Sequence, residues 1–215
     1  METLFNCAVN DNSETSLNDL RGYAEAGDVC AQYHYGKCFE CEKWRNNQEA
    51  LKYIMLSAAR GFALAQLELG LRYEAGRGVA VDMVEAVKYF EHAAAGGSKT
   101  AQAKFAHCCR LGKGVSQDKN KAGVYYQLAV NEGCDEPAVL CGLGLCTEYG
   151  YGVSENQHEA VGLYRLAAER GNAEAQYLLG VCYKRGNGVL RDVKQAVVYY
   201  TQSAEAGYPA AQYNL

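Results

Sequence analysis

The chain has 215 residues, with 21 Lys and Arg against 25 Asp and Glu, and a formal net charge of −4. Hydrophobic residues make up 49% and charged residues 21% of the chain, a balance that excludes a disordered tail. The mild acidity disfavours a nucleic-acid binder, which carries a basic field. No segment approaches the roughly 20 apolar residues that cross a bilayer. We therefore expect no nucleic-acid partner and no membrane span.

The N-terminal segment, residues 1–27, has neither the basic start nor the apolar run of a secretory signal. Residues 17–27 have the pattern of the second half of a helix pair, which predicts an N-terminal capping helix. A cytoplasmic location is the resulting expectation. An effector secreted without a cleavable signal would share these features.

From residue 28 onward, one pattern recurs. An anchor residue, usually Ala, stands at positions 31, 65, 101, 139, 175 and 211, at intervals of 34, 36, 38, 36 and 36 residues. A Gly or Ala follows five residues later, then in four copies a Gly-x-Gly-Val segment, an apolar block with aromatic residues, and a closing Gly. The expected repeats are 28–61, 62–97, 98–133, 134–171 and 172–207, and residues 208–215 would begin a sixth repeat that is cut short.

Each repeat has the signals of two helices. The apolar spacing in residues 175–185 is that of an amphipathic helix. The first Gly of Gly-x-Gly suits a left-handed residue after that helix. An Asp or Asn then stands where the second helix begins, and we predict helix N-caps at Asp82, Asp118, Asn156 and Asp192.

Two repeats depart from the pattern. The first lacks Gly-x-Gly and is two residues shorter, whereas the fourth has two extra residues before its first helix. A helix pair of this size cannot bury its apolar face alone, so neighbouring pairs must stack. The sequence thus predicts an all-α, right-handed α/α solenoid of about five helix-turn-helix repeats.

The motifs resemble those of a known family. Residues 173–180 read Ala-Glu-Ala-Gln-Tyr-Leu-Leu-Gly, and Gly186-x-Gly-Val and Ala204-x-x-Gly207 follow. This pattern is similar to that of Sel1-like repeat proteins, which are related to the tetratricopeptide family, and it covers residues 28–215. The resemblance implies a non-catalytic adaptor that assembles protein complexes.

Cysteine recurs at one position of the repeat. Cys38, Cys108, Cys146 and Cys182 stand seven residues after the anchor, and Arg72 takes this place in the second repeat. Recurrence at the repeat interval is typical of a packing position, because a free Cys behaves as a small buried hydrophobe. Stacked helices lie roughly 10 Å apart, beyond the reach of a disulfide between equivalent positions. Some Sel1-like relatives have a disulfide in each repeat, but this chain lacks the regular pair of cysteines that forms it.

One alternative is a metal- or redox-responsive scaffold. Cys30, His34, Cys38 and Cys41 lie on one side of the first expected helix, and two of them could share a zinc ion. All four span about 16 Å at 1.5 Å per residue, so one ion cannot gather them. We expect a packing face here, and neither a metal nor a cofactor.

Catalysis is the third possibility. The chain has no Gly-x-Ser-x-Gly nucleophile elbow, and His158-Glu159 does not continue into a zinc-protease motif. Some cysteine-rich relatives are linked to β-lactam binding or hydrolysis, which leaves a weak β-lactam-binding hydrolase as an alternative by family analogy alone.

The resemblance also implies where a partner binds. In the tetratricopeptide family the first helices line a concave face, which here corresponds to positions −1, +2, +6, +9 and +10 from the anchor. We predict a peptide or partner segment there, with an acidic or C-terminal carboxylate portion toward the C-terminal repeats, bound to a monomer. The predicted contact residues are Tyr33, Lys37, Leu67, Leu71, His107, Arg110, Cys141, Glu148, Tyr149, Tyr177, Lys184 and Arg185.

Overall fold

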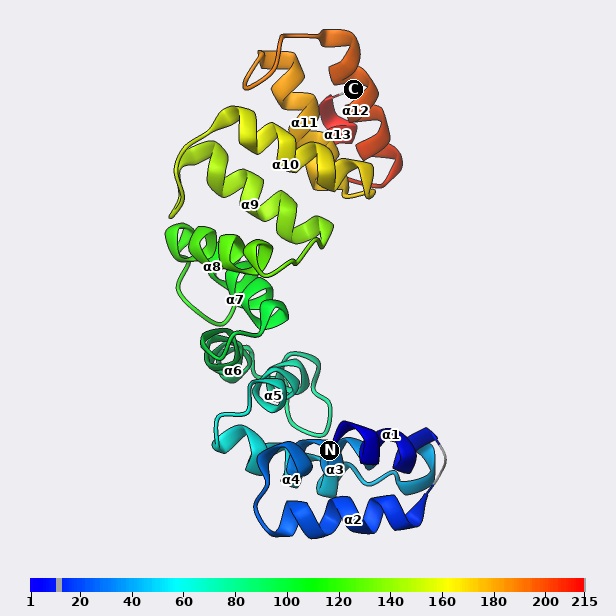
Figure 1. The fold of residues 1–215 in the computed structure, drawn as a ribbon. Coiled ribbons are helices and arrows are strands. Elements are labelled where there is room, and N and C mark those ends of the chain that lie inside the picture. Colours follow the sequence, from blue (N-terminus) through cyan, green and yellow to red (C-terminus); the bar gives the residue numbers. More distant parts are fainter. Residues whose placement is uncertain (11–12, 215) are drawn as a thin grey trace. The chain divides into compact units, whose positions relative to one another are not determined.

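The computed structural model describes residues 1–10 and 13–214. Over these residues the chain forms α-helices, one short 3-10 helix and turns, without strands, which confirms the all-α prediction (Figure 1). None of the helices in the described part is long and apolar enough to cross a membrane.

The chain divides into two compact units. One comprises residues 1–102 and 113–115, and the other residues 103–112 and 116–215. The first unit holds α1 (Glu2–Asn10), α2 (Glu14–Glu25), α3 (Val29–Cys38), the 3-10 helix η1 (Glu42–Trp44), α4 (Asn47–Ala59), α5 (Ala63–Ala75) and α6 (Met83–Ala95). Helix α7 (Lys99–Leu111) begins in the first unit and ends in the second. The second unit continues with α8 (Lys119–Asn131), α9 (Pro137–Tyr149), α10 (Gln157–Glu169), α11 (Ala173–Arg185), α12 (Val193–Glu205) and α13 (Pro209–Asn214).

Within each unit the helices stack in chain order. From α1 to α6, and again from α8 to α13, each helix packs against the next (Figure 1). Helix α3 also contacts α1. This succession of helix pairs is the stacking that the repeats predict, with the first helices α3, α5, α7, α9 and α11 alternating with the second helices α4, α6, α8, α10 and α12.

The helix ends follow the predicted signals. The side chain of Asp192 accepts hydrogen bonds from the backbone N–H groups of Lys194 and Gln195, and Asp82 caps α6 in the same way. Asp118 and Asn156 cap α8 and α10, so all four predicted N-caps are confirmed. Gly186 ends α11 in the left-handed conformation, with φ 80°, which a residue with a Cβ rarely adopts.

The second glycine of each later Gly-x-Gly loop lies against the preceding repeat. Gly152 and Gly188 both have positive φ, 67° and 66°. A Cβ at Gly188 would overlap the backbone of Gln157, at the start of α10, and one at Gly152 would overlap the backbone of Asn120 in α8. These loops therefore join one repeat to the one before it by direct backbone contact.

Small residues let each first helix approach its own second helix. A Cβ at Gly144 would lie 2.7 Å from the Tyr164 ring, and one at Gly180 would lie 2.8 Å from the Tyr200 ring. Tyr164 is completely buried and Tyr200 is 3% exposed. The aromatic residue of the second helix thus fills the space that the glycine leaves.

The N-terminal segment holds two helices rather than one. Helix α2 occupies the region of the expected capping helix, and its Leu20 and Ala24 are buried in one cluster with Cys38. Helix α1 was not predicted, because residues 1–10 lie outside the repeat pattern. Its Ala8 is fully buried in the same cluster. Of the expected sixth repeat, α13 is described, whereas Leu215 lies outside the described residues.

Candidate functional site

The predicted contact positions share one side of each first helix. At 100° per residue, positions −1, +2, +6, +9 and +10 fall within an arc of about 100°. The anchor and the residue four after it point elsewhere, into the core: Ala175 and Leu179, for example, are fully buried. The arc is therefore the side of the first helix that is turned away from its own core.

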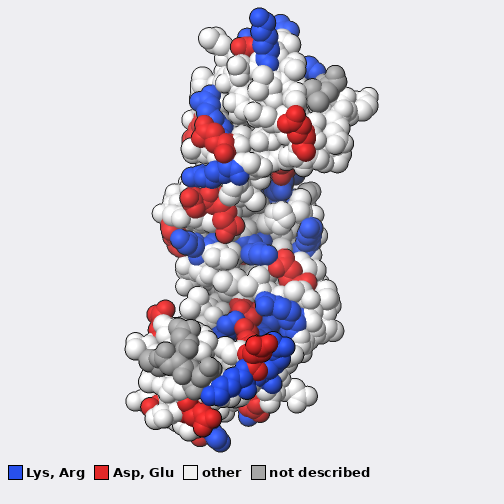
Figure 2. All heavy atoms as spheres, turned by 90° about the vertical axis from the view of Figure 1, so that its right-hand side faces the viewer, with Lys and Arg blue, Asp and Glu red and all other residues white. Residues whose placement is uncertain are grey.

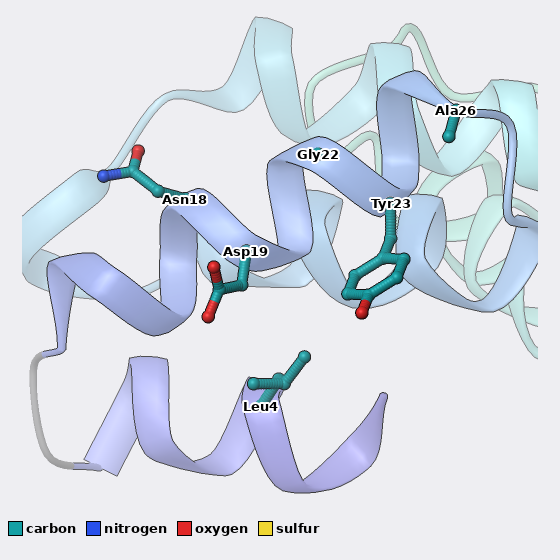
Figure 3. A pocket seen from close by; sticks show the side chains of 6 residues that line it. All are labelled: Leu4, Asn18, Asp19, Gly22, Tyr23 and Ala26. Carbon is teal, nitrogen blue, oxygen red and sulfur yellow. The ribbon is translucent and has the colours of Figure 1, made fainter.

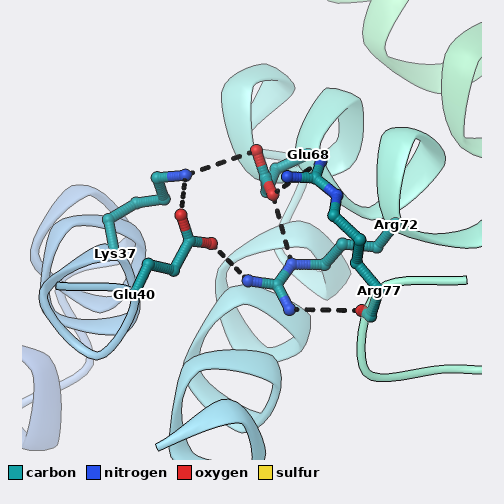
Figure 4. A network of polar contacts seen from close by, with 5 residues as sticks. All are labelled: Lys37, Glu40, Glu68, Arg72 and Arg77. Carbon is teal, nitrogen blue, oxygen red and sulfur yellow. Dashed lines mark hydrogen bonds and ion pairs between the residues drawn. The ribbon is translucent and has the colours of Figure 1, made fainter. Parts of the chain in front are cut away.

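In the first unit, Lys37 and Glu40, on this side of α3 and of the turn that follows it, form ion pairs with side chains of α5 (Figure 4). Lys37 and Glu40 of α3 meet Glu68 and Arg72 of α5, and Arg77 joins from the following loop (Figure 4). Arg72 Nε lies 3.2 Å and Lys37 Nζ 3.5 Å from Glu68, and Arg72 also pairs with Glu40. The Arg72 side chain is only 5% exposed. The charge of Lys37, a predicted contact residue, is thus already neutralised within the protein.

The other predicted contacts of the first unit are apolar or aromatic. The Tyr33 ring packs edge-on against Phe62, with ring centroids 5.5 Å apart. Burial, with the nearby carboxylates of Glu68 and Glu40, raises the pKa of Tyr33 to about 12, so its phenol stays protonated. Leu67 and Leu71 are half-buried. Their role as contacts stays a prediction.

In the second unit, Arg110 of α7 reaches across to α11. Its Nη1 lies 3.2 Å from Glu174 Oε1, and the two side chains are 19% and 31% exposed. Burial opposes the charge of Arg110, yet Glu174 and the Tyr126 hydroxyl outweigh it, so the pKa of Arg110 is raised. Arg110 is therefore held by the protein itself rather than presented to solvent.

The prediction for Cys141 is wrong. Its side chain is 1% exposed, so the thiol does not lie on a surface that a partner could touch. Burial raises the pKa of this thiol, the charge of Glu174 raises it further, and the charge of Arg110 acts in the opposite direction. Cys141 belongs to a buried hydrophobic cluster with Leu140 and Tyr164.

Glu148 has a structural role in the fourth repeat. The Tyr164 hydroxyl donates a hydrogen bond of 2.7 Å to Glu148 Oε2, which ties α10 to α9. Burial, followed by this hydrogen bond, raises the pKa of Tyr164. Glu148 is half-buried, and the neighbouring Tyr149 is 54% exposed.

The remaining predicted residues lie at different depths. Tyr177 packs against Tyr200 and Tyr208, at centroid distances of 5.7 and 5.4 Å, and His107 is half-buried. Lys184 and Arg185 are exposed in the last turn of α11. Of the predicted cations, these two are the exposed ones.

A pocket of about 370 Å³ lies entirely in the second unit. Two of its lining residues, Arg110 and Tyr149, were predicted as contacts. The others were missed by sequence reasoning. Tyr151 carried a usable signal, because it stands between the glycines of its loop, where the other loops have Arg77, Lys113 and Asn187. The lining consists of Arg110, Leu111, Gln117, Lys119, Leu145, Cys146, Tyr149 and Tyr151.

A second pocket, of about 580 Å³, lies between α1 and α2 (Figure 3). It is lined by Leu4, Asn18, Asp19, Gly22, Tyr23 and Ala26. Asp19 is its single charged lining residue, and the labelled side chains in Figure 3 do not converge on one point. It offers no group of residues suited to chemistry.

The alternative of a metal or redox centre at Cys30, His34, Cys38 and Cys41 gains no support from the structure. Within the described residues, no three His, Cys, Asp or Glu side chains are grouped so that they could hold a metal ion. The His34 ring packs on Phe5 of α1, with centroids 5.1 Å apart, and burial lowers its pKa. Cys38 is buried, and burial raises its pKa to about 12. The packing interpretation of the cysteine column is confirmed, since Cys108, Cys146 and Cys182 are all 2–3% exposed.

One catalytic spacing was overlooked in the sequence. Ser116 and Lys119 have the Ser-x-x-Lys separation of β-lactam-binding serine enzymes. Asp118 caps α8, so Ser116 lies in the loop before that helix. The Lys119 ammonium lies over the Tyr151 ring, 5.1 Å from its centroid. This lysine faces an aromatic ring, an arrangement that does not activate a serine.

Charges on the surface are mixed in sign. On the face shown in Figure 2, Lys and Arg alternate with Asp and Glu, and no broad basic field forms there.

Comparison with known proteins identifies the repeat. The model of the Sel1 repeat matches residues 30–62, 63–98, 100–134, 137–172 and 173–208. Among curated proteins, none matches the chain.

Two solved structures are similar over nearly the whole chain. A Sel1 repeat protein from Oxalobacter formigenes is 30% identical, with a TM-score of 0.75, over 99% of this chain and 88% of that one. The protein c5321, a protective antigen of uropathogenic Escherichia coli strains with an SLR fold, is 28% identical, with a TM-score of 0.55. That match covers 93% of this chain and 50% of c5321.

Proposed function

Because the chain belongs to the Sel1 repeat family, whose repeats generally mediate protein–protein interaction, we propose that it is a non-catalytic scaffold that binds a partner segment. The binding surface in this proposal is the side of the first helices turned away from the core. The observation that carries the proposal is the group of exposed residues at the ends of α9 and α11. Tyr149 is 54% exposed there, and Lys184 and Arg185 are exposed. Aromatic and arginine side chains are the usual anchors of protein interfaces.

The partner segment is acidic in this proposal. In the first unit, Lys37 and Arg72 are already paired with Glu40 and Glu68. In the second unit, the charges of Lys184 and Arg185 face solvent. A carboxylate-bearing segment gains most where cations are exposed and not already paired.

The burial of the thiols supports a non-catalytic role. Burial raises the pKa of Cys146 to about 11 and of Cys182 to about 12, so neither supplies a thiolate near neutral pH. A metal- or redox-responsive scaffold is disfavoured by the packing of His34 and Cys38, and no observation favours a β-lactam hydrolase. We further propose that the protein works as a cytoplasmic monomer without nucleic acid, which fractionation and light scattering would test.

The test is capture of a partner with three versions of the protein. Wild type is compared with Lys184→Glu/Arg185→Glu and with the control Lys52→Glu/Lys88→Glu, which makes the same charge change on second helices of the first unit. Both control lysines are exposed. The outcome expected is that wild type and control retain the same protein, identified by mass spectrometry, and that the Lys184/Arg185 variant loses it. Circular dichroism verifies that the variants fold. Equal retention by all three, or by none, would overturn the proposal.

A further inference from the structure

The 370 Å³ pocket of the second unit is built by three neighbouring segments. The last turn of α7 contributes Arg110 and Leu111, and the last turns of α9 contribute Leu145, Cys146 and Tyr149. The remaining wall consists of Gln117 and Lys119, before and at the start of α8, and Tyr151 from a Gly-x-Gly loop. Ligand pockets of proteins measure about 300–1,000 Å³, so this one is at the small end of that range.

One wall of the pocket is aromatic. The rings of Tyr149 and Tyr151 are stacked, with centroids 5.7 Å apart and planes inclined by 26°. The Gln117 side chain donates a 2.8 Å hydrogen bond to the Arg110 carbonyl oxygen, which holds the loop against α7. Leu111 is 42% exposed and Leu145 is half-buried, so the pocket also offers apolar surface.

The charged lining residues are both cations. Arg110 is paired with Glu174, which is not a lining residue. The Lys119 ammonium lies 5.1 Å from the centroid of the Tyr151 ring. Within the described residues it has no carboxylate partner. The Cys146 thiol stays uncharged near neutral pH because burial raises its pKa to about 11. A pocket with apolar and aromatic walls, whose charged lining residues are both cations, is complementary to an apolar group beside a carboxylate.

We propose that this pocket takes one apolar or aromatic side chain of an acidic peptide, with the adjacent carboxylate paired to Lys119. The inference rests on the proposed function and names the anchor residue that the scaffold selects in its partner. The side chain packs against Leu111, Leu145 and the Tyr149 ring. Lys119 then discriminates between charged and neutral segments.

Two small probes of nearly equal shape test the proposal. N-acetyl-L-phenylalanine carries a carboxylate, whereas N-acetyl-L-phenylalaninamide does not. Both are titrated into the full chain, and binding is followed by NMR of the methyl groups of Leu111 and Leu145. We expect saturable shifts at these methyl groups with both probes. An exposed ion pair contributes about 0.2–1 kcal/mol, so the amide should bind up to about fivefold more weakly.

Matched variants test separately the binding of the apolar side chain and the preference for the carboxylate. Tyr149→Ala should remove binding of both probes, whereas the control Tyr213→Ala, at a side chain 91% exposed, should leave it unchanged. Lys119→Glu should abolish the preference for the carboxylate probe, and Lys194→Glu, near the start of α12, should not. An acidic residue is favourable in the first turn of a helix, so Lys119→Glu keeps α8 intact.

Failure of this proposal is distinguishable from failure of the proposed function. Absence of saturable shifts at Leu111 and Leu145, or equal affinity for both probes, would overturn the pocket proposal. If partner capture nevertheless required Lys184 and Arg185, the scaffold function would stand. Conversely, probe binding that follows the expected pattern, without any captured partner, would support the pocket and overturn the scaffold proposal.

Discussion

The same position of the first helix is filled by an arginine in α5 of the first unit and by a cysteine in α9 and α11 of the second unit. In α5 it holds Arg72, whose side chain is 5% exposed, and in α9 and α11 it holds Cys146 and Cys182, which are 2% and 3% exposed. The thiols pack without ionic partners, whereas the guanidinium is surrounded by Glu68 and Glu40. The repeat thus provides a buried space that accepts a small uncharged side chain alone, or a cation together with its acids.

The residue one turn earlier explains the difference. Four residues before Arg72 stands Glu68, whereas Gly142 and Leu178 hold that place before Cys146 and Cys182. A buried charge is costly unless it is paired and hydrogen-bonded. The buried arginine therefore depends on acidic residues at more than one position, including Glu40 in the preceding repeat.

The largest effect is expected when Arg72, the central residue of the buried ion pairs, is replaced. Arg72→Ala leaves Glu68, whose side chain is 10% exposed, without its closest partner. Removal of one member of a buried ion pair costs about 3–5 kcal/mol, so the free energy of unfolding should fall by that amount. Urea unfolding followed by circular dichroism measures it.

A compensated variant sharpens this test. Arg72→Cys/Glu68→Leu copies the pair Leu178 and Cys182 of the fifth repeat, and it should regain most of the loss because no buried charge remains. If the double variant were as unstable as Arg72→Ala, the ion pair of the second repeat could not be replaced by the uncharged residues of the fifth. The comparison between the two repeats would then be wrong.

A smaller effect is expected at the ion pair of the second unit. Arg110→Met keeps the length of the side chain but removes its 3.2 Å contact with Glu174, and both groups are partly solvated. We expect a loss of about 1–2 kcal/mol, between the values of exposed and buried pairs. Adding Glu174→Gln completes a double-mutant cycle, and a coupling energy near zero would show that the pair does not stabilise the unit.

The smallest effect concerns the cysteines and is measured as their rate of alkylation. Near pH 8, Cys146 and Cys182 should resist iodoacetamide in the folded protein, because burial raises their pKa to about 11 and about 12. Their alkylation should rise as the pH approaches these values, because the thiolate forms there. Cys30 and Cys41, which are half-buried, should react before the buried thiols.

Peptide mapping by mass spectrometry, in a Cys7→Ser background, identifies the labelled sites. Rapid labelling of Cys182 at pH 8 without unfolding would contradict the assignment of these thiols to the core.

The sequence predicted those features that repeat. Asp192 and Gly186 were recognisable as helix ends because their neighbours at the same interval carry the same signals, and Cys182 was recognisable as a packing residue for the same reason. Features that occur once were missed. Helix α1 lies outside the repeats, and the pairing of Arg72 with Glu40 joins residues 32 positions apart. Cys141 was misplaced because its position is variable along the chain, although in the fourth repeat it is buried.

The glycines that touch a preceding helix give the array a direction of assembly. The loop at Gly188 rests on the first residues of α10, which belong to the repeat before it. A ribosome makes the chain from the N-terminus, so α10 is complete before this loop emerges and can serve as its template. The later Gly-x-Gly loops then fold onto a neighbouring repeat that already exists.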